Sequence, residues 1–313
     1  MVDSLLHTPV AFLIFNRPET TAQVFEAIRA ARPPKLLIVA DGPRQNRPGE
    51  AELCAEVRAI ASDVDWPCEV LTNYSDVNMG CKARISSGLD WVFSQVEEAI
   101  ILEDDCLPTE SFFGFCEMML DRYRDNERVM MIAGTNFLLD EAGRENSCYF
   151  SNMVSIWGWA TWRTSWQKRI TDFGVINTTL IAARFNSRTY SKYIVKMLRG
   201  AISGSIDTWD VQWFYSVILN NAICVTPLMN QVKNIGYLGT HTSGTSSPFF
   251  DMETKNFDLS RLKYPDSLTI SSEFDSTAMN NIIKYNRIPR NLFELVLNKI
   301  AKTFRIMKSN FSR

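Results

Sequence analysis

Several patterns that commonly identify a function are missing from this sequence. It has no GxGxxG after its first predicted strand and no GxxxxGK[S/T], so neither a dinucleotide-binding turn nor a P-loop is predicted. Its seven cysteines form no CxxC pair, and only two histidines are present. An odd number of cysteines without such pairs fits reduced thiols better than a disulfide framework or a zinc site, so we expect a cytoplasmic protein.

Long apolar runs and an excess of basic charge are also lacking. No window reaches the roughly 18 to 20 apolar residues that span a bilayer. The N-terminal segment has no basic region and the apolar run 10–15 is short, so we expect neither a signal peptide nor a membrane-spanning helix. The formal net charge of -2 argues against nucleic acid as a partner, because phosphate backbones attract basic surfaces.

The composition that remains is that of a globular protein, with 46% hydrophobic and 22% charged residues. Buried strands alternate with amphipathic helices along the first half, which predicts an α/β fold with a mostly parallel central sheet flanked by helices. The predicted strands are 9–16, 34–41, 68–72, 99–102 and 129–133, and the predicted helices are 18–31, 50–62, 78–93 and 112–120.

Polar or charged side chains close several predicted strands. In open α/β sheets, ligands bind beyond the carboxyl ends of the strands, so these side chains are candidate ligand contacts. They are Asn16, Arg17, Asp41, Glu103, Asp104 and Asp105.

The last three of these residues form an acidic triplet directly after an apolar run. Adjacent carboxylates repel one another, and burying them is costly unless a positive charge is near. Mg²⁺ or Mn²⁺ would supply that charge, because both prefer oxygen ligands and often bind substrate phosphates as well. The alternative is a solvated acidic turn with no ligand.

Four residues of the first half are candidates for contact with a nucleotide. Asp41 could accept a hydrogen bond from a base, and Arg17 could stack on the base or pair with a phosphate. Lys82 and Arg84 follow a loop at the predicted start of a helix, where basic groups and backbone N–H groups could meet a diphosphate. Capping, surface ion pairs or a solvated basic face would explain the same residues without a ligand.

The second half of the chain is rich in tryptophan. Trp157, Gly158 and Trp159 begin a segment that could lie in the core or form a platform for sugar rings. Asp207 precedes Trp209 at the start of a predicted helix, where it could be an N-cap or a general base. His241, in a loop rich in glycine and threonine, could be a surface residue or a further metal ligand.

Taken together and in order, these motifs resemble GT-A glycosyltransferases over roughly residues 8–245. The closest likeness is to a bacterial family, similar to family 2, that is related to the fold of N-acetylglucosaminyltransferase I. The segments that carry the resemblance are Asn16-Arg17-Pro18, Asp41-Gly42, 78–84, 103–105 with Phe112-Phe113, Gly158-Trp159, Asp207-Thr208-Trp209, Asn234 to Gly236 and Thr240-His241-Thr242.

The resemblance implies an inverting, metal-dependent glycosyltransferase that uses a nucleoside diphosphate sugar, with UDP as the expected nucleotide. Arg17 and Asp41 would contact uridine, Asp104 the ribose, and Asp105 the Mn²⁺ or Mg²⁺ ion. Trp157, Gly158, Trp159 and Trp209 would lie near the donor sugar and the acceptor. The general base would be Asp207 or Asp210, with Asp207 favoured, and a glycan or lipid-linked acceptor is expected. Asp207-Thr208 replaces two adjacent acids of the family, so the resemblance does not indicate which sugar the donor carries.

We expect residues 1–140 to form a nucleotide-sugar-binding half, residues 141–250 an acceptor-side half with a helical region, and residues 251–313 a C-terminal extension. Residues 288–313 form a basic amphipathic pattern, which predicts a helix that lies on the inner membrane face, packs on the domain or pairs subunits. Two other functions stay open, namely a nucleotidyltransferase and a non-catalytic carbohydrate-binding protein.

Overall fold

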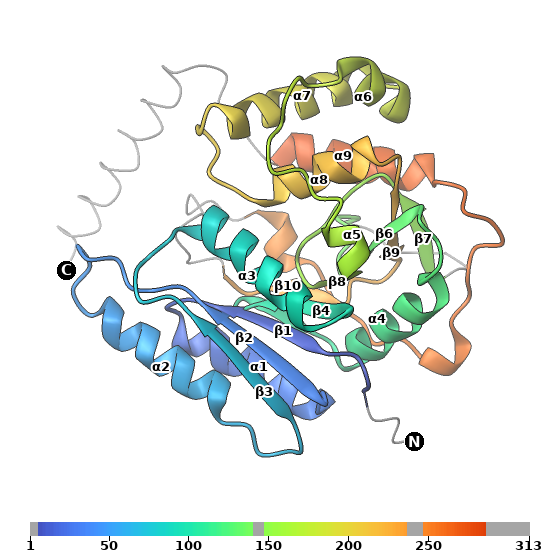
Figure 1. The fold of residues 1–313 in the computed structure, drawn as a ribbon. Coiled ribbons are helices and arrows are strands. Elements are labelled where there is room, and N and C mark those ends of the chain that lie inside the picture. The colour runs from blue at the N-terminus through green and yellow to red at the C-terminus, as the bar shows by residue number, and fades with distance from the viewer. Residues whose placement is uncertain (1–5, 140–146, 237–246, 286–313) are drawn as a thin grey trace, which may run out of the picture.

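The computed structural model describes residues 6–139, 147–236 and 247–285, and these residues form a mixed α/β structure. Figure 1 shows a central sheet with helices on both faces. In the described part of the chain this sheet has eight strands, in the order β3 (Glu69–Tyr74), β2 (Lys35–Ala40), β1 (Val10–Ile14), β4 (Glu98–Glu103), β8 (Trp159–Trp162), β6 (Val129–Ala133), β9 (Ile223–Pro227) and β7 (Cys148–Ser151).

The strand directions divide the sheet into two parts. Strands β3, β2, β1 and β4 are mutually parallel, whereas β8 lies antiparallel between β4 and β6. Strand β9 is parallel to β6, and β7 is antiparallel to β9 at the edge. A separate antiparallel pair joins β5 (Cys106–Pro108) to β10 (Val232–Asn234). The prediction of a mostly parallel sheet flanked by helices is confirmed.

Period-2 alternation explains how the sheet fills two hydrophobic cores. In β1, Phe12 packs in the core on one face and Leu13 in the core on the other, because successive side chains point to opposite faces. One face is covered by α1 (Pro18–Ala31), α2 (Glu50–Ser62) and α4 (Glu110–Tyr123), and the other by α3 (Cys81–Gln95), α5 (Arg163–Trp166) and α8 (Asp210–Leu219).

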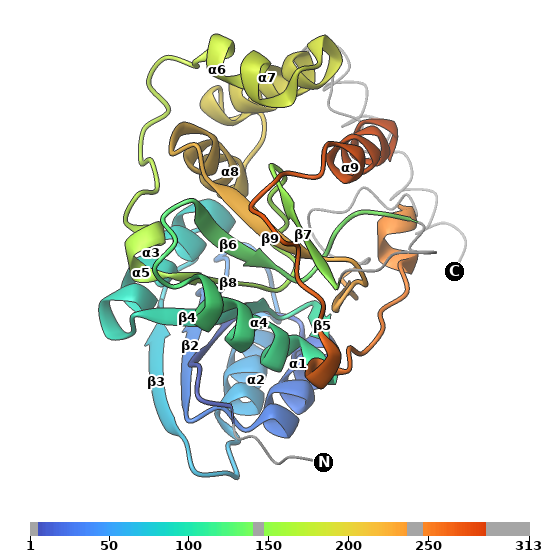
Figure 2. The same ribbon diagram turned by 90° about the vertical axis from the view of Figure 1, so that its right-hand side faces the viewer.

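A second helical layer covers α8 on its outer side. It consists of α6 (Thr178–Phe185), α7 (Arg188–Ile202) and part of α9 (Ser272–Tyr285), which share a third hydrophobic cluster with α8. Figure 2 shows α6 and α7 at the end of the molecule away from α1 and α2. The helical region predicted within residues 141–250 therefore includes α6 and α7.

Some elements differ from those that the sequence predicts. Strands β5, β7 and β8 and helix α9 were not predicted, and α3 begins at Cys81 instead of Asn78. Helix α8 begins at Asp210 with Trp209 as its N-cap, so of the two alternatives for Asp207 the N-cap is excluded.

Residues after the predicted boundary at 250 pack on the rest of the chain. Short helices η1 (Pro248–Asp251) and η2 (Leu259–Arg261) lie at and after that boundary, and Phe257 lies in the core against Phe115. The predicted amphipathic helix at 288–313 lies outside the described residues. No helix in the described ranges is long and apolar enough to cross a bilayer.

Candidate functional site

A cavity of about 600 Å³ opens at the carboxyl ends of β1, β2 and β4. Strand β1 lies between β2 and β4, so the order of the parallel strands reverses here, and ligands bind at such points in open α/β sheets. The cavity brings together Arg17, Asp41, Arg44, Arg84, Glu103, Asp104, Asp105, Trp157, Asp207, Asn234, Gly236 and Phe250. Most of these wall residues are therefore ones that the sequence singled out, from both halves of the chain.

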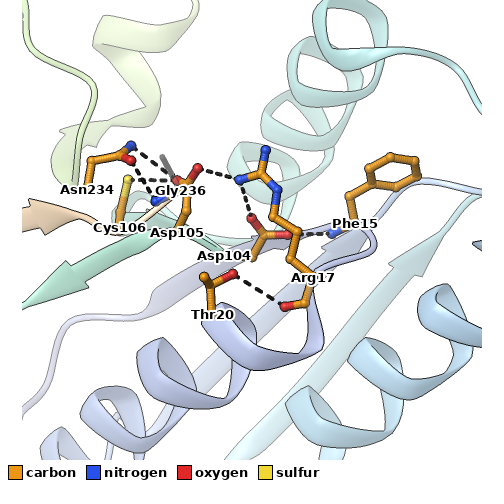
Figure 3. A network of polar contacts seen from close by, with 8 residues as sticks. All are labelled: Phe15, Arg17, Thr20, Asp104, Asp105, Cys106, Asn234 and Gly236. Atoms are coloured by element: carbon orange, nitrogen blue, oxygen red, sulfur yellow. Dashed lines mark hydrogen bonds and ion pairs between the residues drawn. The ribbon is translucent and has the colours of Figure 1, made fainter. Parts of the chain in front are cut away.

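Two acids of the triplet, Asp104 and Asp105, contact one arginine at the floor of this cavity (Figure 3). Arg17 Nη1 lies 2.5 Å from Asp105 Oδ2 and 3.6 Å from Asp104 Oδ1. The backbone N–H of Phe15 donates to Asp104 Oδ2 at 3.0 Å, which ties the triplet to the end of β1. Arg17 follows β1, whereas the acids lie at the end of β4, so the parallel pairing of these strands brings them together.

Burial and mutual repulsion raise the pKa values of two acids of the triplet, Glu103 and Asp104. Burial, reinforced by Asp105 and Asp104, raises the pKa of Glu103 well above its ordinary value. Burial and Asp105 likewise raise the pKa of Asp104, although Arg17 opposes the change. Burial lowers the pKa of Arg17, but the neighbouring carboxylates outweigh that effect and raise it overall. The cavity floor therefore favours an added positive charge.

The donor set of this floor fits a hard divalent cation. Glu103 Oε1 is buried and has no hydrogen-bond partner in the described part of the chain, and Asp105 presents its carboxylate to the same cavity. No group of three His, Cys, Asp or Glu residues among those described is arranged as a complete metal site. Mg²⁺ and Mn²⁺ bound with a nucleotide need only one or two protein carboxylates, because phosphates and waters supply the remaining ligands.

Close packing by β5 and β10 fixes the position of Asp105. Asn234 Nδ2 donates to Asp105 Oδ1 at 3.4 Å, and the N–H of Ile235 donates to the carbonyl oxygen of Asp105 at 2.8 Å. A Cβ atom added to Gly236 would lie 2.1 Å from Asp105 Oδ2, so only glycine leaves room for this carboxylate. The segment from Asn234 to Gly236 therefore holds Asp105 in position.

Asp41 organises the loop before α3. Its carboxylate accepts hydrogen bonds from the N–H groups of Gly42, Met79 and Gly80 and from Asn78 Nδ2, at 2.9 to 3.1 Å. These four bonds use the lone pairs of both oxygens. The residue lines the cavity, but its main contacts are with protein, and this differs from the predicted contact with a base.

Arg84 lines the cavity, and its guanidinium also binds protein groups. Its guanidinium donates to the carbonyl oxygens of Ala40 at 3.1 Å and Asn73 at 2.5 Å, and to Asn73 Oδ1 at 2.6 Å. Burial lowers the pKa of Arg84. Its donors hold together the ends of β2 and β3, so Arg84 has a structural role there, and its contact with a phosphate stays a prediction. Lys82, half-buried in the first turn of α3, is not part of the cavity wall.

The two candidate bases occupy different positions. Asp207 lines the cavity together with the acidic triplet, although it is distant from the triplet in sequence. Asp210 is turned toward its own helix end, where it accepts hydrogen bonds from the Thr208 hydroxyl and from the N–H of Val211. Burial raises the pKa of Asp210. Asp207 is therefore the one of the two that is placed to meet a ligand.

Two of the predicted sugar-binding tryptophans are core residues. Trp159 is 0% exposed and Trp209 is 2% exposed, and their ring centroids lie 5.7 Å apart. Trp166 and Trp213 complete this buried cluster. Because β8 lies in the middle of the sheet and α8 covers it, these indoles have no free face for a sugar, and the prediction of a platform at both positions is wrong.

Trp157 differs from these residues because it reaches the cavity. Its ring stacks on Phe250 with a centroid distance of 5.7 Å and an interplanar angle of 22°. Both residues line the cavity, so they form an aromatic wall on it. Phe250 was missed from the sequence, because nothing local indicates that η1 packs beside the segment that leads into β8.

Two further predicted residues, Asn16 and Gly158, do not line the cavity. Asn16 donates from Nδ2 to Glu50 Oε1 at 2.9 Å. Gly158 has a φ of +65°, and an added Cβ would lie 2.5 Å from Val232, so its role is close packing. His241 lies outside the described residues. Arg44, a wall residue that was not singled out, pairs with Glu50 and lies over the Phe15 ring.

Comparisons with known proteins add no functional assignment: no protein-family model matches the chain, and a search of curated proteins finds no match.

Proposed function

We propose that this chain is an inverting glycosyltransferase of the GT-A type, related to the fold of N-acetylglucosaminyltransferase I. It would transfer a sugar from a nucleoside diphosphate donor, with UDP as the expected nucleotide, to a hydroxyl group of a glycan or glycolipid. The supporting observation is that one cavity at the strand-order reversal contains both the Arg17 and Asp105 pair and Asp207. A donor site and a base are the two parts that a single-displacement transfer requires.

In this proposal the floor of the cavity holds the diphosphate end of the donor. Asp105 and the unpartnered oxygen of Glu103 would hold Mn²⁺ or Mg²⁺, which supplies charge neutralisation for the leaving diphosphate. Arg17 is the guanidinium next to this position and would pair with a phosphate oxygen. Asp104, tied to the N–H of Phe15, would face the ribose.

Asp207 and the aromatic wall would form the acceptor end. Asp207 takes the proton of the acceptor hydroxyl while that oxygen bonds to the anomeric carbon of the donor and the nucleoside diphosphate leaves. A general base of this kind typically contributes about 10² to 10⁴-fold in rate. Trp157 and Phe250 present aromatic surface to the same cavity, and such surface packs well on the C–H faces of a sugar ring.

The donor site can be tested by thermal unfolding with nucleoside mono- and diphosphates, with and without Mn²⁺. UDP with Mn²⁺ at about 100 times its Kd should stabilise the fold by about 2.7 kcal/mol, a rise in Tm of about 5 °C. Asp105→Asn should lose this rise, because the substitution removes a carboxylate charge from the metal position.

The matched control is Asp121→Asn, since the Asp121 side chain is 83% exposed on α4. This variant should keep the full response to UDP and Mn²⁺. A wild-type protein that responds to no nucleoside diphosphate, or an Asp105→Asn variant with an unchanged response, would contradict the proposed donor site.

A further inference from the structure

The segment between Asp172 and Asp207 differs in charge from the rest of the chain. It contains no Asp or Glu, although the whole sequence has 35 acids and 33 Lys and Arg residues. Its five cations are Arg184, Arg188, Lys192, Lys196 and Arg199. Four of these lie in α7, so this helix concentrates positive charge in a protein with a slightly negative total.

The geometry of α7 places those four cations along one stripe. At 3.6 residues per turn, positions 188, 192, 196 and 199 lie within roughly 80° of the helix circumference. The opposite side carries Ile194, Leu198 and Ala201, which are buried in the cluster that α7 shares with α8. The buried side fixes the rotation of the helix, and Arg188, Lys192 and Arg199 are exposed as a result. We call these three residues the basic face of α7.

The basic face is not neutralised by neighbouring acids. Arg188, Lys192 and Arg199 make no ion pair with any residue that the structure describes, whereas other cations of the described chain do pair with acids. Arg29 pairs with Glu26, for example. Ile202, at the end of α7, leaves 50% of its surface exposed. The exposed surface therefore consists mainly of long cationic side chains, which suits an electrostatic contact with an anionic surface.

The position of α7 links this surface to the cavity. Figures 1 and 2 show α6 and α7 as the outermost layer on one end of the molecule. The chain runs from the end of α7 at Ile202 to Asp207 on the cavity wall, and the N–H of Ile206 donates to the carbonyl oxygen of Gly200 at 3.0 Å. The short connection therefore holds Asp207 close to the end of the basic helix.

We propose that the basic face of α7 docks the protein on an anionic membrane surface. A bilayer with anionic lipids presents a plane of negative charge that a stripe of lysine and arginine can meet without a shaped pocket. Ile202 adds an exposed apolar side chain at the C-terminal end of α7, beside the stripe. Docking through α7 brings the Asp207 side of the cavity near the lipid headgroups. Membrane docking does not depend on glycosyltransferase activity, because it is inferred only from the charge and exposure of α7.

Vesicle co-sedimentation of the full chain tests this inference. Wild type should bind vesicles of phosphatidylcholine with phosphatidylglycerol in about 0.1 M salt, should bind pure phosphatidylcholine much less, and should be released at about 1 M salt. Replacing all three residues of the basic face by glutamine should weaken partition by about tenfold or more, since each basic residue at the surface contributes measurably.

The matched control replaces two arginines and one lysine elsewhere by glutamine, which gives the same change of net charge. Arg47, Arg128 and Lys255 are suitable, because all three are exposed. This control should bind anionic vesicles like wild type, and far-UV circular dichroism of both variants should match wild type.

Three results would overturn the inference. The first is a wild type that does not bind anionic vesicles, and the second is equal binding by the α7 variant and the control variant. The third is retention of wild type by a soluble polyanion such as heparin with no binding to vesicles, which would assign the basic face to a different partner. The nucleotide response in thermal unfolding should stay unchanged in the α7 variant. A negative result for vesicle binding can therefore be distinguished from a negative result for the donor site.

Discussion

Arg17 balances the negative charge at the floor of the cavity. Its guanidinium contacts two carboxylates of the triplet while it is partly buried, with 26% of its side chain exposed. Partly buried carboxylates in contact need a positive partner, and removing that partner is generally more damaging than removing the whole cluster. Arg17 therefore has two roles in this account: it stabilises the acids within the fold, and it supplies positive charge at the proposed diphosphate position.

We expect the side chain of Arg84 to stabilise the fold. Arg84→Met should lower the free energy of unfolding by about 3 kcal/mol, because three hydrogen bonds from a charged donor to oxygens of Ala40 and Asn73 are lost. Lys82→Met, two positions away and half-buried, should change it by less than about 0.5 kcal/mol. Urea unfolding of both variants measures this difference. A stable Arg84→Met variant that fails to bind nucleotides would instead assign Arg84 to the ligand.

Residue identity alone predicted the triplet, but it did not predict which tryptophans are buried and which reach the cavity. The acidic triplet after an apolar run indicated Glu103, Asp104 and Asp105 as candidate site residues, with a solvated acidic turn as the alternative, and all three line the cavity. Tryptophan is equally suited to a core and to a ligand platform. Only the long-range packing of β8 against α8 shows that Trp159 is buried while Trp157 reaches the cavity.

At the scale of elements, α9 is fixed to the sheet by one buried acid. The Ser151 hydroxyl donates to Asp275 Oδ1 at 2.5 Å, and the N–H of Asn152 donates to Oδ2 at 2.9 Å. Ser151 ends β7, so these bonds join the start of α9 to the edge of the sheet. Burial raises the pKa of Asp275 above its ordinary value of 3.8, although the hydrogen bonds from Ser151 and Asn152 oppose this effect.

The raised pKa of Asp275 predicts a pH dependence of stability. The folded chain keeps the proton on Asp275 at pH values where the unfolded chain has lost it, so this residue favours folding most below about pH 4. The contribution is lost as pH rises through the raised pKa, and a tenfold difference in proton affinity between the folded and unfolded chains corresponds to about 1.4 kcal/mol. Relative to Asp275→Asn, wild type should therefore lose unfolding free energy as pH increases from about 4 to neutral.

Chemical unfolding of wild type and Asp275→Asn at several pH values measures this difference. The control is Asp121→Asn, an exposed acid, whose difference from wild type should stay nearly constant over the same range. A wild-type advantage over Asp275→Asn that grows with rising pH would have the opposite sign and would show that the carboxylate is stabilised in the folded chain.

Local pattern predicted most elements of the first half and fewer of the second. Buried strands and amphipathic helices between 10 and 133 have regular periods, and their predicted ranges agree closely with β1, β2, β3, β4, β6 and α1 to α4. Strand β8 contains two tryptophans in four residues and follows Gly158, a pattern without a clear period. It becomes a strand because β4 and β6 pair with it on both sides.

At the scale of the whole molecule, the second half of the chain completes the sheet that the first half begins. Strand β8 is inserted between β4 and β6, and β9 and β7 extend the far side. This insertion carries Trp157 to the cavity, and the segment before α8 brings Asp207 to the same place. The cavity is therefore assembled from segments that no short stretch of sequence contains, which is why local pattern indicated many of its wall residues but not Arg44 or Phe250.

The basic face of α7 would determine how the whole molecule is oriented on a membrane. Its stripe of cations is visible in the sequence as helical spacing, but its exposure follows only from the packing of α7 on α8. With the cavity connected to α7 through residues 203–206, membrane docking would place the Asp207 side of the cavity toward acceptors carried by lipids.

Turnover of UDP-sugars by wild type, Asp207→Asn and Asp105→Asn distinguishes sugar transfer from nucleotidyl transfer when release of UDP and of pyrophosphate are both measured, in the presence of Mn²⁺ and candidate acceptors. We expect acceptor-dependent release of UDP without pyrophosphate by wild type. Asp207→Asn should keep metal-dependent UDP binding but transfer at least about 100-fold more slowly, and Asp105→Asn should lose both. Pyrophosphate release, or an Asp207→Asn variant as active as wild type, would contradict the proposed function.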